Sequence, residues 1–319
     1  PGENENRRSV FVAPADGTRE PHHLTRVSDA RNPTWGPDGD RLAVNMARER
    51  DIELAVGREA VSASEETETD DTEDDANGTA DDPKSQVWVF DLTLGGDPRQ
   101  VTEFDEGVDA FDWSPDGDRF VVTARDPTEE QNEYLAGVRE EDAPYEVTRL
   151  QHKKNGTGYL DDVRSYLFVV DTGAVGADAE SGATRLDEAY GRGANSEYYG
   201  LQPAWGPADR IAFVSYRGDD PDATYALDVY TVAPDGADLA RVTNSDVTAA
   251  GLQWSPDGTR LSFLASHPRN IYYPTEVHVA GRGVAVGDTC ETWSVSASLD
   301  RTVPRSGCAE WVNDDRLLA

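Results

Sequence analysis

Cysteine, lysine and long apolar runs are scarce in this sequence, and each scarcity excludes a class of protein. Two cysteines in 319 residues exclude a disulfide framework and a four-cysteine zinc site. No apolar run approaches the roughly 20 residues that span a bilayer, so we expect no membrane protein. The sequence begins at Pro1 and has no signal segment, so we expect a cytoplasmic chain that is trimmed or fragmentary.

Positive charge is also scarce. The chain has 62 acidic and 29 basic residues, which gives a formal net charge of −33. The field of such a chain repels phosphates and anionic lipids, so we expect neither nucleic acid nor membrane as a partner. Segment 59–83 (EAVSASEETETDDTEDDANGTADDP) holds 11 of the acidic residues and no basic or aromatic residue, which predicts a disordered insertion. Without it 51 acidic residues still face 29 basic ones, a net charge of −22.

Only Lys84, Lys153 and Lys154 are lysines, and the other 26 basic residues are arginines. High acidity with few lysines resembles the proteins of salt-accumulating archaea, and we expect a halophilic source. In molar salt the Debye length is short, so the acidic residues repel one another less. An acidic surface that binds a partner is the alternative.

An internal repeat dominates what is present. Five of the seven tryptophans occupy one position in it: Trp35 (WGPDGDRLAV), Trp113 (WSPDGDRFVV), Trp205 (WGPADRIAFV), Trp254 (WSPDGTRLSF) and Trp311 (WVNDDRLLA). Pro fixes φ at the second residue of the turn, Asp accepts backbone hydrogen bonds, and Gly can adopt a positive φ. Each unit therefore predicts a hairpin whose first strand ends in Trp, and we expect these tryptophans to be blade-packing residues.

A second apolar strand follows each hairpin, as in QVWVFD at Gln86 and YLFVVD at Tyr166, and a further strand follows that. Four strands at a period of roughly 40–50 residues predict the blades of a β-propeller. We expect an all-β chain of five to six blades, forming one domain over 1–319, with no helix of more than two turns. The interval between Asp126 and Arg164 is about 30 residues too long, so 127–163 is either an excursion from one blade or a degenerate sixth blade.

The repeat WSPDG-x-R followed by apolar residues resembles two groups of propellers. One is TolB, a periplasmic partner-binding protein, and the other is the N-terminal domain of acylaminoacyl peptidases in the prolyl oligopeptidase family. The excursion sequence TRLQHKKNGTGY (148–159), which leads into RSYLFVVD (164–171), is similar to the peptidase type. The resemblance covers essentially the whole chain. It implies a seven- or eight-bladed propeller that caps an α/β-hydrolase with a Ser, Asp and His triad and admits only short peptides.

The sequence departs from that family in one respect, because it contains no G-x-S-x-G elbow for a nucleophilic serine. We expect the catalytic domain to be absent from this chain and the chain itself to carry no catalytic residue. Its expected role is the noncatalytic, substrate-gating propeller of a serine-type peptidase. The expected partners are an α/β-hydrolase domain, in the same protein or an adjacent chain, and short peptides. The alternative is a TolB-like or WD-type propeller that binds proteins.

The excursion is the most distinctive surface feature, because it holds two of the three lysines. Its candidate contacts to a peptide or to the hydrolase domain are Arg149, Lys153, Lys154, Tyr159 and Arg164. The alternative is an extended hairpin whose charges are merely solvated. We expect no metal and no cofactor, because none of the five histidines has metal-ligand spacing. Cys290 and Cys308 could form one disulfide, although a cytoplasmic chain argues against it.

The spread of acidic charge predicts a fold that needs salt. The melting temperature should rise between roughly 0.1 M and 2 M KCl, across which the Debye length falls from about 10 Å to under 3 Å. Thermal unfolding followed by circular dichroism measures this, and a flat or falling melting temperature would refute the halophile interpretation.

Overall fold

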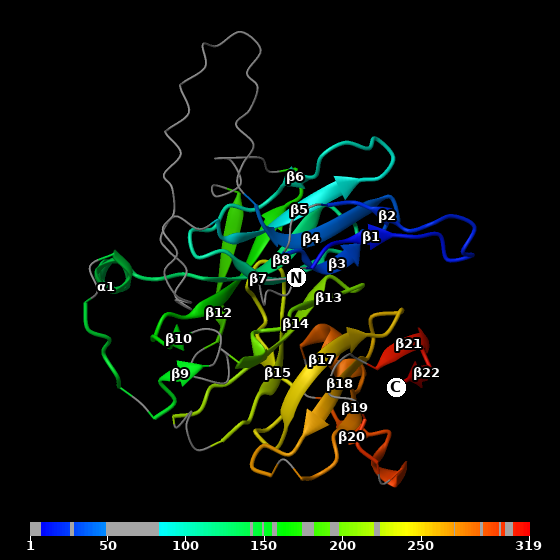
Figure 1. The fold of residues 1–319 in the computed structure, drawn as a ribbon. Coiled ribbons are helices and arrows are strands. Elements are labelled where there is room, and N and C mark those ends of the chain that lie inside the picture. The colour runs from blue at the N-terminus through cyan, green and yellow to red at the C-terminus, as the bar shows by residue number, and fades with distance from the viewer. Residues whose placement is uncertain are drawn as a thin grey trace.

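The computed structural model in Figure 1 describes residues 8–25, 29–48, 83–140, 143–148, 150–154, 158–173, 182–191, 198–219, 224–270, 272–287, 290–299, 301–303 and 309–319. The segment expected to be disordered, 59–83, lies outside these ranges except for Pro83. Arg149 and Cys308 also lie outside them, and Cys290 is a half-buried free thiol whose pKa is raised by burial.

Within the described residues, four antiparallel sheets of four strands each follow one another along the chain, and we call them blades 1 to 4. Blade 1 consists of β3 (Arg31–Trp35), β4 (Arg41–Ala47), β5 (Ser85–Asp91) and β6 (Arg99–Gln100). Blade 2 consists of β7 (Val108–Trp113), β8 (Arg119–Arg125), β11 (Ser165–Asp171) and β12 (Ala183–Gly191). Blade 3 consists of β13 (Ala204–Gly206), β14 (Arg210–Ser215), β15 (Asp228–Val232) and β16 (Ala240–Arg241). Blade 4 consists of β17 (Thr248–Trp254), β18 (Leu261–Ser266), β19 (Glu276–Ala280) and β20 (Thr292–Ser294). The expectation of an all-β chain built from four-stranded blades is confirmed.

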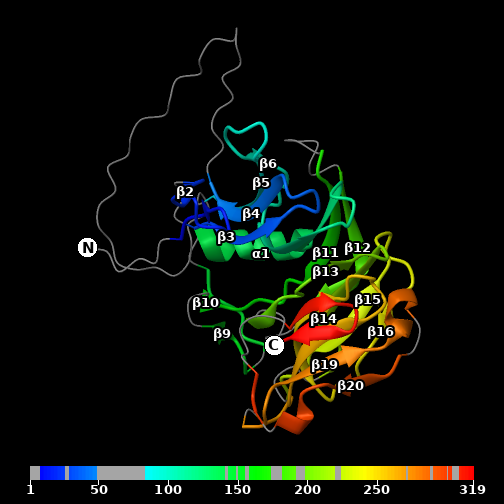
Figure 2. The same cartoon turned by 90° about the vertical axis from the view of Figure 1, so that its right-hand side faces the viewer.

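Two smaller sheets lie before and after the blades, namely β1 (Phe11–Val12) with β2 (His22–His23), and β21 (Glu310–Asn313) with β22 (Arg316–Leu318). Both lie at the right in Figure 1 and face the viewer in Figure 2. Two short 3₁₀ helices, Arg282–Val286 and Ala297–Leu299, flank β20. The five to six expected blades thus correspond, in the described residues, to four full blades and these two hairpins.

The Trp motif forms the turn between the first and second strands of each blade. In blade 2 the Ser114 hydroxyl oxygen accepts the Arg119 N–H at 2.9 Å, and Gly117 lies in the left-handed region at φ 74°. Gly258 repeats this conformation in blade 4 at φ 68°. The blade 3 motif is one residue shorter, and Asp209 takes the left-handed position at φ 55°. Asp tolerates that region better than most side chains, so the turn survives without its glycine.

The core lies between neighbouring blades. The second strands are buried on both sides, because alternate side chains face the blade before and the blade after. Phe120, Phe213 and Phe263 are fully buried, and they belong to the apolar clusters between blades 1 and 2, 2 and 3, and 3 and 4 respectively. A blade therefore buries its apolar surface only against other blades.

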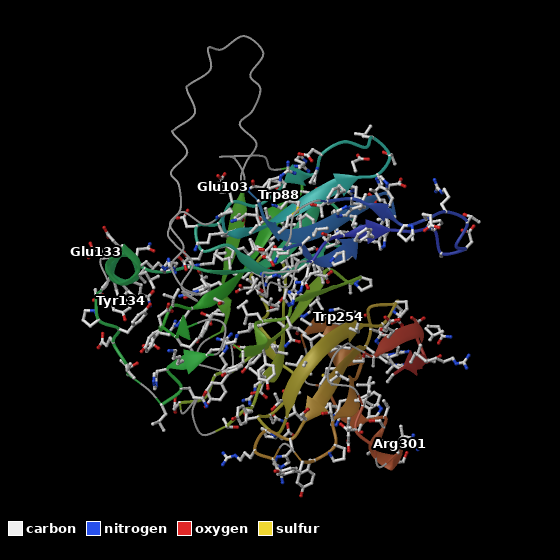
Figure 3. All side chains as sticks on the ribbon, in the orientation of Figure 1. Trp88, Glu103, Glu133, Tyr134, Trp254 and Arg301 are labelled. Atoms are coloured by element: carbon white, nitrogen blue, oxygen red, sulfur yellow. The ribbon has the colours of Figure 1, made fainter. Side chains whose placement is uncertain are left out.

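Three of the motif tryptophans link adjacent modules by the same hydrogen bond. In each case the indole N–H donates to a backbone carbonyl in the preceding blade, that of the residue directly before the motif Trp of that blade. The three bonds are Trp113 to Thr34 (3.2 Å), Trp254 to Ala204 (3.0 Å) and Trp311 to Gln253 (3.1 Å). Trp254 is labelled in Figure 3 between blades 3 and 4. Gly206 lies beneath it, and a Cβ there would come within 2.6 Å of the ring.

The motif arginine adds a second contact between blades. The guanidinium of Arg41 in blade 1 lies 5.0 Å from the centre of the Trp113 ring, and that of Arg119 in blade 2 lies 4.9 Å from the Trp205 ring. The tryptophans differ in burial, since Trp35 is 50% exposed whereas Trp113 is only 5% exposed. The described chain before Trp35 forms only the two-stranded sheet β1–β2, which leaves much of that ring uncovered.

The boundary between blades 2 and 3 uses a carboxylate in place of the indole bond. The Trp205 indole donates within its own turn, to Asp209 Oδ1 at 2.9 Å. Across the boundary Asp112 Oδ2 accepts the Trp205 backbone N–H at 2.8 Å, and Asp112 Oδ1 accepts the Trp113 N–H at 2.9 Å. Desolvation raises the pKa of Asp112 to about 6, although both hydrogen bonds favour its ionised form.

The expectation of no helix longer than two turns is wrong. Helix α1 (Glu129–Glu140) has 12 residues, which is more than three turns. Thr128 and Gln131 form a capping box, in which Thr128 Oγ1 accepts the Gln131 N–H (3.3 Å) and Gln131 Oε1 accepts the Thr128 N–H (2.9 Å). No helix in the described part of the chain is long and apolar enough to cross a membrane.

We predict that the indole bond between blades is a main source of stability. Trp254→Phe removes the donor to the buried Ala204 carbonyl and part of a packed ring, which should lower the free energy of unfolding by about 2–4 kcal/mol. The matched control Trp35→Phe alters a half-exposed ring and should cost under about 1 kcal/mol. Urea unfolding measures both, and equal losses would show that the bond between blades contributes little.

The raised pKa of Asp112 predicts that the protein becomes less stable as the pH rises. Because its folded pKa of about 6 exceeds the unfolded value of about 3.8, the folded state binds this proton more tightly. The resulting stabilisation is complete below the unfolded pKa and is lost as pH rises through about 6. Relative to Asp112→Asn, the wild type should therefore lose up to about 3 kcal/mol between pH 4 and pH 7.5. Urea unfolding of both proteins across this range measures the difference, and a difference that does not vary with pH would show that Asp112 titrates normally.

Candidate functional site

The connections between strands divide the blades into two faces. In an antiparallel sheet successive connections alternate between the two ends of the strands. The Trp-motif turns and the links from third to fourth strand therefore lie at one end, the turn face. The links from second to third strand, and those that lead to the next blade, lie at the other end, which we call the loop face.

The excursion belongs to the loop face, because β8 pairs directly with β11 and residues 126–164 leave and rejoin blade 2 between them. Its described part contains α1 and the hairpin of β9 (Lys153–Lys154) and β10 (Gly158–Tyr159), which lie at the left in Figure 1. It forms no further blade within the described residues.

Salt bridges anchor the excursion to the blades. Arg139 of α1 binds Glu106 through both guanidinium nitrogens, at 2.7 and 2.9 Å, and Glu106 lies in the link between blades 1 and 2. Arg125 at the end of β8 also approaches Glu106 (3.5 Å) and binds Asp161 at 2.6 Å. The hydrogen bond from Arg139 is the main cause that lowers the pKa of Glu106, so this half-buried group stays ionised. Tyr134, labelled in Figure 3, accepts the backbone N–H of Glu146 at its hydroxyl oxygen (2.8 Å) and so ties α1 to the chain that follows.

The hairpin β9–β10 joins two of the predicted site residues. The Lys153 ammonium lies 4.8 Å from the centre of the Tyr159 ring, and Tyr159 stacks on Tyr145 with ring centres 4.2 Å apart. The ring of His152 lies 6.3 Å from that of Tyr159. Lys153 is thus held against an aromatic cluster as well as exposed to solvent.

The remaining predicted residues are spread over neighbouring elements. The Lys154 ammonium lies 5.0 Å from the ring of Tyr198, which is in the link to blade 3. Arg164 lies 4.9 Å from the ring of Tyr190 on β12, a ring that Arg217 also contacts. The four candidates that the structure describes therefore do not form one cluster, and Arg149 lies outside the described residues.

A groove of about 500 Å³ opens beside the excursion, between blades 3 and 4. Blade 3 and its links contribute Tyr199, Gln202 and Tyr225, and blade 4 and its links contribute Thr248, Ala250, Gly251, Leu264, Ser266, His267 and Thr275. At the groove β17 has an irregular register between Ala250 and Gln253, where Gly251 adopts φ 61°. Ala250 has only a methyl group and Gly251 has no side chain, so neither fills the part of the groove that we call its floor.

Hydrogen bonds across the groove hold its two walls together. Gln202 Oε1 accepts the Gly251 N–H across the groove at 2.9 Å, and within the blade 3 wall Gln202 Nε2 donates to the Tyr199 carbonyl at 2.9 Å. The Thr248 hydroxyl donates to the Tyr225 carbonyl at 2.7 Å. The groove is thus a preformed feature of the blade 3–4 boundary.

Exposed tyrosines gather on the loop face. Every tyrosine that is exposed in the described chain lies there, with 40–91% exposure: Tyr159, Tyr198, Tyr199, Tyr225, Tyr272 and Tyr273. Tyrosine is enriched at protein interfaces because its ring has a large apolar surface and its hydroxyl can hydrogen-bond. The loop face therefore has one feature that is common at protein interfaces.

Sequence reasoning missed the groove and the exposed tyrosines of the loop face, although the sequence holds a signal for the tyrosines. The doublets Tyr198-Tyr199 and Tyr272-Tyr273 lie outside any apolar alternation and next to Gly200 and Pro274, which marks them as aromatic residues in loops. The capping box at Thr128 was likewise a readable signal for α1.

Comparisons with known proteins bear on the fold. No family model matches the chain, and none of the curated proteins matches its sequence. The uncomplexed acylaminoacyl peptidase of Pyrococcus horikoshii matches with a TM-score of 0.55 at 16% identity, over 93% of this chain and 36% of that one. The β-propeller domain of the Trilobed protease from Pyrococcus furiosus matches with a TM-score of 0.51 at 14% identity, over 96% of this chain and 69% of that one.

The fold is a β-propeller. TolB from Acinetobacter baumannii also matches, with a TM-score of 0.49 at 15% identity, over 90% of this chain and 48% of that one. At these identities the two Pyrococcus matches establish the propeller architecture alone. The propeller chain spans about a third of the Pyrococcus horikoshii peptidase and about half of that TolB.

Proposed function

We propose that this propeller is the noncatalytic, access-restricting domain of a serine-type acylaminoacyl peptidase or oligopeptidase. An α/β-hydrolase domain, in the same protein or an adjacent chain, contacts its loop face, and short peptides pass between the two. The propeller fold, which solved peptidase structures share, makes this role available.

The observation that carries the proposal is the gathering of exposed tyrosines on the loop face. A face rich in tyrosine can bury a large area at a low cost in side-chain entropy, whereas the Asp-rich turns of the opposite face stay hydrated. The salt bridges of Arg139 with Glu106 and of Arg125 with Asp161 hold the excursion on this face. Lys153 and Lys154 place positive charge there, where an acidic hydrolase surface or a peptide carboxylate would meet it.

The experiment combines the chain with the α/β-hydrolase domain encoded next to it, in cis or in trans. The propeller alone should neither hydrolyse acyl-peptide chromogenic substrates nor react with a fluorophosphonate probe, because its sequence has no nucleophile elbow. The hydrolase with the propeller should cleave short acyl-peptides and spare casein, whereas the hydrolase alone should lose that size selection.

Replacing both Lys153 and Lys154 with Ala should raise the peptide KM or weaken domain association roughly two- to tenfold, and should barely change the melting temperature of the propeller. The control, Arg282→Ala with Arg316→Ala, removes the same charge from exposed positions outside the loop face. Labelling of the isolated propeller would show that it is catalytic. A hydrolase that neither binds the propeller nor gains size selection would favour a protein-binding propeller of the TolB or WD type.

A further inference from the structure

The groove between blades 3 and 4 lacks charged residues in a chain dominated by them. None of its ten lining residues is charged, although 29% of the chain is Asp, Glu, Lys or Arg. A charged group of either sign would lose hydration on entering the groove and would find no oppositely charged side chain among the lining residues. The charge pattern therefore selects an uncharged occupant.

The size and lining of the groove fit a small ligand. A volume of about 500 Å³ lies within the range of pockets that bind small molecules, roughly 300–1,000 Å³. The buried Leu264 and the small residues Ala250 and Gly251 give it apolar surface, and the half-exposed rings of Tyr199 and Tyr225 stand beside them. Such a combination accommodates an aromatic or aliphatic side chain.

The polar groups of the groove suit an amide backbone. Within the described residues, neither the Tyr199 nor the Tyr225 hydroxyl has a hydrogen-bond partner, so both can donate to a carbonyl or accept from an N–H. His267 Nδ1 accepts the Arg269 N–H at 3.1 Å, so a neutral His267 carries its proton on Nε2 and can donate it. Gln202 is already committed to the groove walls.

From these observations we propose that the groove is a binding subsite for an uncharged peptide segment that carries an aromatic or aliphatic side chain. The inference deepens the proposed function and rests on it for the choice of a peptide over another neutral ligand. The groove lies next to the excursion, because Tyr199 follows Tyr198, whose ring the Lys154 ammonium contacts. A peptide held in this groove therefore lies on the face where we place the hydrolase.

The test uses the full chain without any hydrolase, so that its failure is distinct from failure of the proposed function. Three N-acetylated, C-amidated tripeptides, Gly-X-Gly with X as Phe, Lys or Glu, are titrated and followed by saturation-transfer NMR. The Phe peptide should bind at least about fivefold more tightly than the Lys and Glu peptides. Maltotriose is the fourth ligand, because a sugar is also uncharged and also uses tyrosine rings and hydroxyls.

Three variants locate the site. Tyr225→Ala removes one wall and Ala250→Phe fills the floor, and each should weaken binding of the Phe peptide at least about fivefold. Tyr272→Ala is the matched control, because Tyr272 is 91% exposed on the same face but does not line the groove, and it should bind as the wild type does. Circular dichroism identifies any variant that fails to fold, and the two groove variants test the site independently.

Several results would overturn the inference. Undiminished binding by folded Tyr225→Ala and Ala250→Phe would place the peptide elsewhere. Equal affinity for the Glu or Lys peptide would refute the selection by charge. No binding of the Phe peptide, or binding of maltotriose in its place, would refute a peptide subsite even if the hydrolase still associates with the loop face.

Discussion

The contact between one blade and the next is the constraint on which the rest of this structure depends. The middle strands of each blade are apolar on both sides, so a single blade has no interior of its own. Stability comes from stacking, as in other repeat architectures. The indole bond from Trp254 to the Ala204 carbonyl and the Arg41 guanidinium over the Trp113 ring set the register of that stack. The motif that makes the turn is therefore also the motif that joins the blades.

Because the turn motifs make the contacts between blades, the loops of the opposite face are under fewer structural constraints. On the turn face, the Trp-motif turns are short, and their Asp, Gly and Pro residues are needed for backbone geometry. The loop face tolerates insertions because the links there do not take part in the contacts between motifs. Residues 126–164 use that freedom, and the salt bridges of Arg139 with Glu106 and of Arg125 with Asp161 give the insertion a fixed position.

Under the proposed function, the acidic residues keep the chain soluble and the exposed tyrosines supply contact area for a partner. A chain with a net charge of −33 resists association over most of its surface, so a docking site needs a region without that charge. The groove between blades 3 and 4 is such a region, and the exposed tyrosines around it supply contact area. The fold thus places a neutral, aromatic surface beside the two lysines of the excursion.

Local sequence signals suffice to predict the blades. The spacing of the Trp motifs and the turn chemistry of Pro, Asp and Gly are local, so strand order and hairpin positions could be predicted residue by residue. The excursion could be placed too, because its extra length interrupts a regular period. Even α1 was encoded locally, in the capping box of Thr128 and Gln131.

Which residues far apart in the sequence come into contact depends on the packing of the blades, and local sequence signals do not show it. Tyr199 and His267 are far apart in sequence, and only the stacking of blade 3 on blade 4 brings them to one groove. The spread of Lys153, Lys154 and Arg164 over separate tyrosines could not be predicted, because each ring comes from an element whose position the packing sets. Local rules act within a few residues of chain, whereas a binding surface depends on how blades are rotated against one another, and that is fixed by the contacts between them.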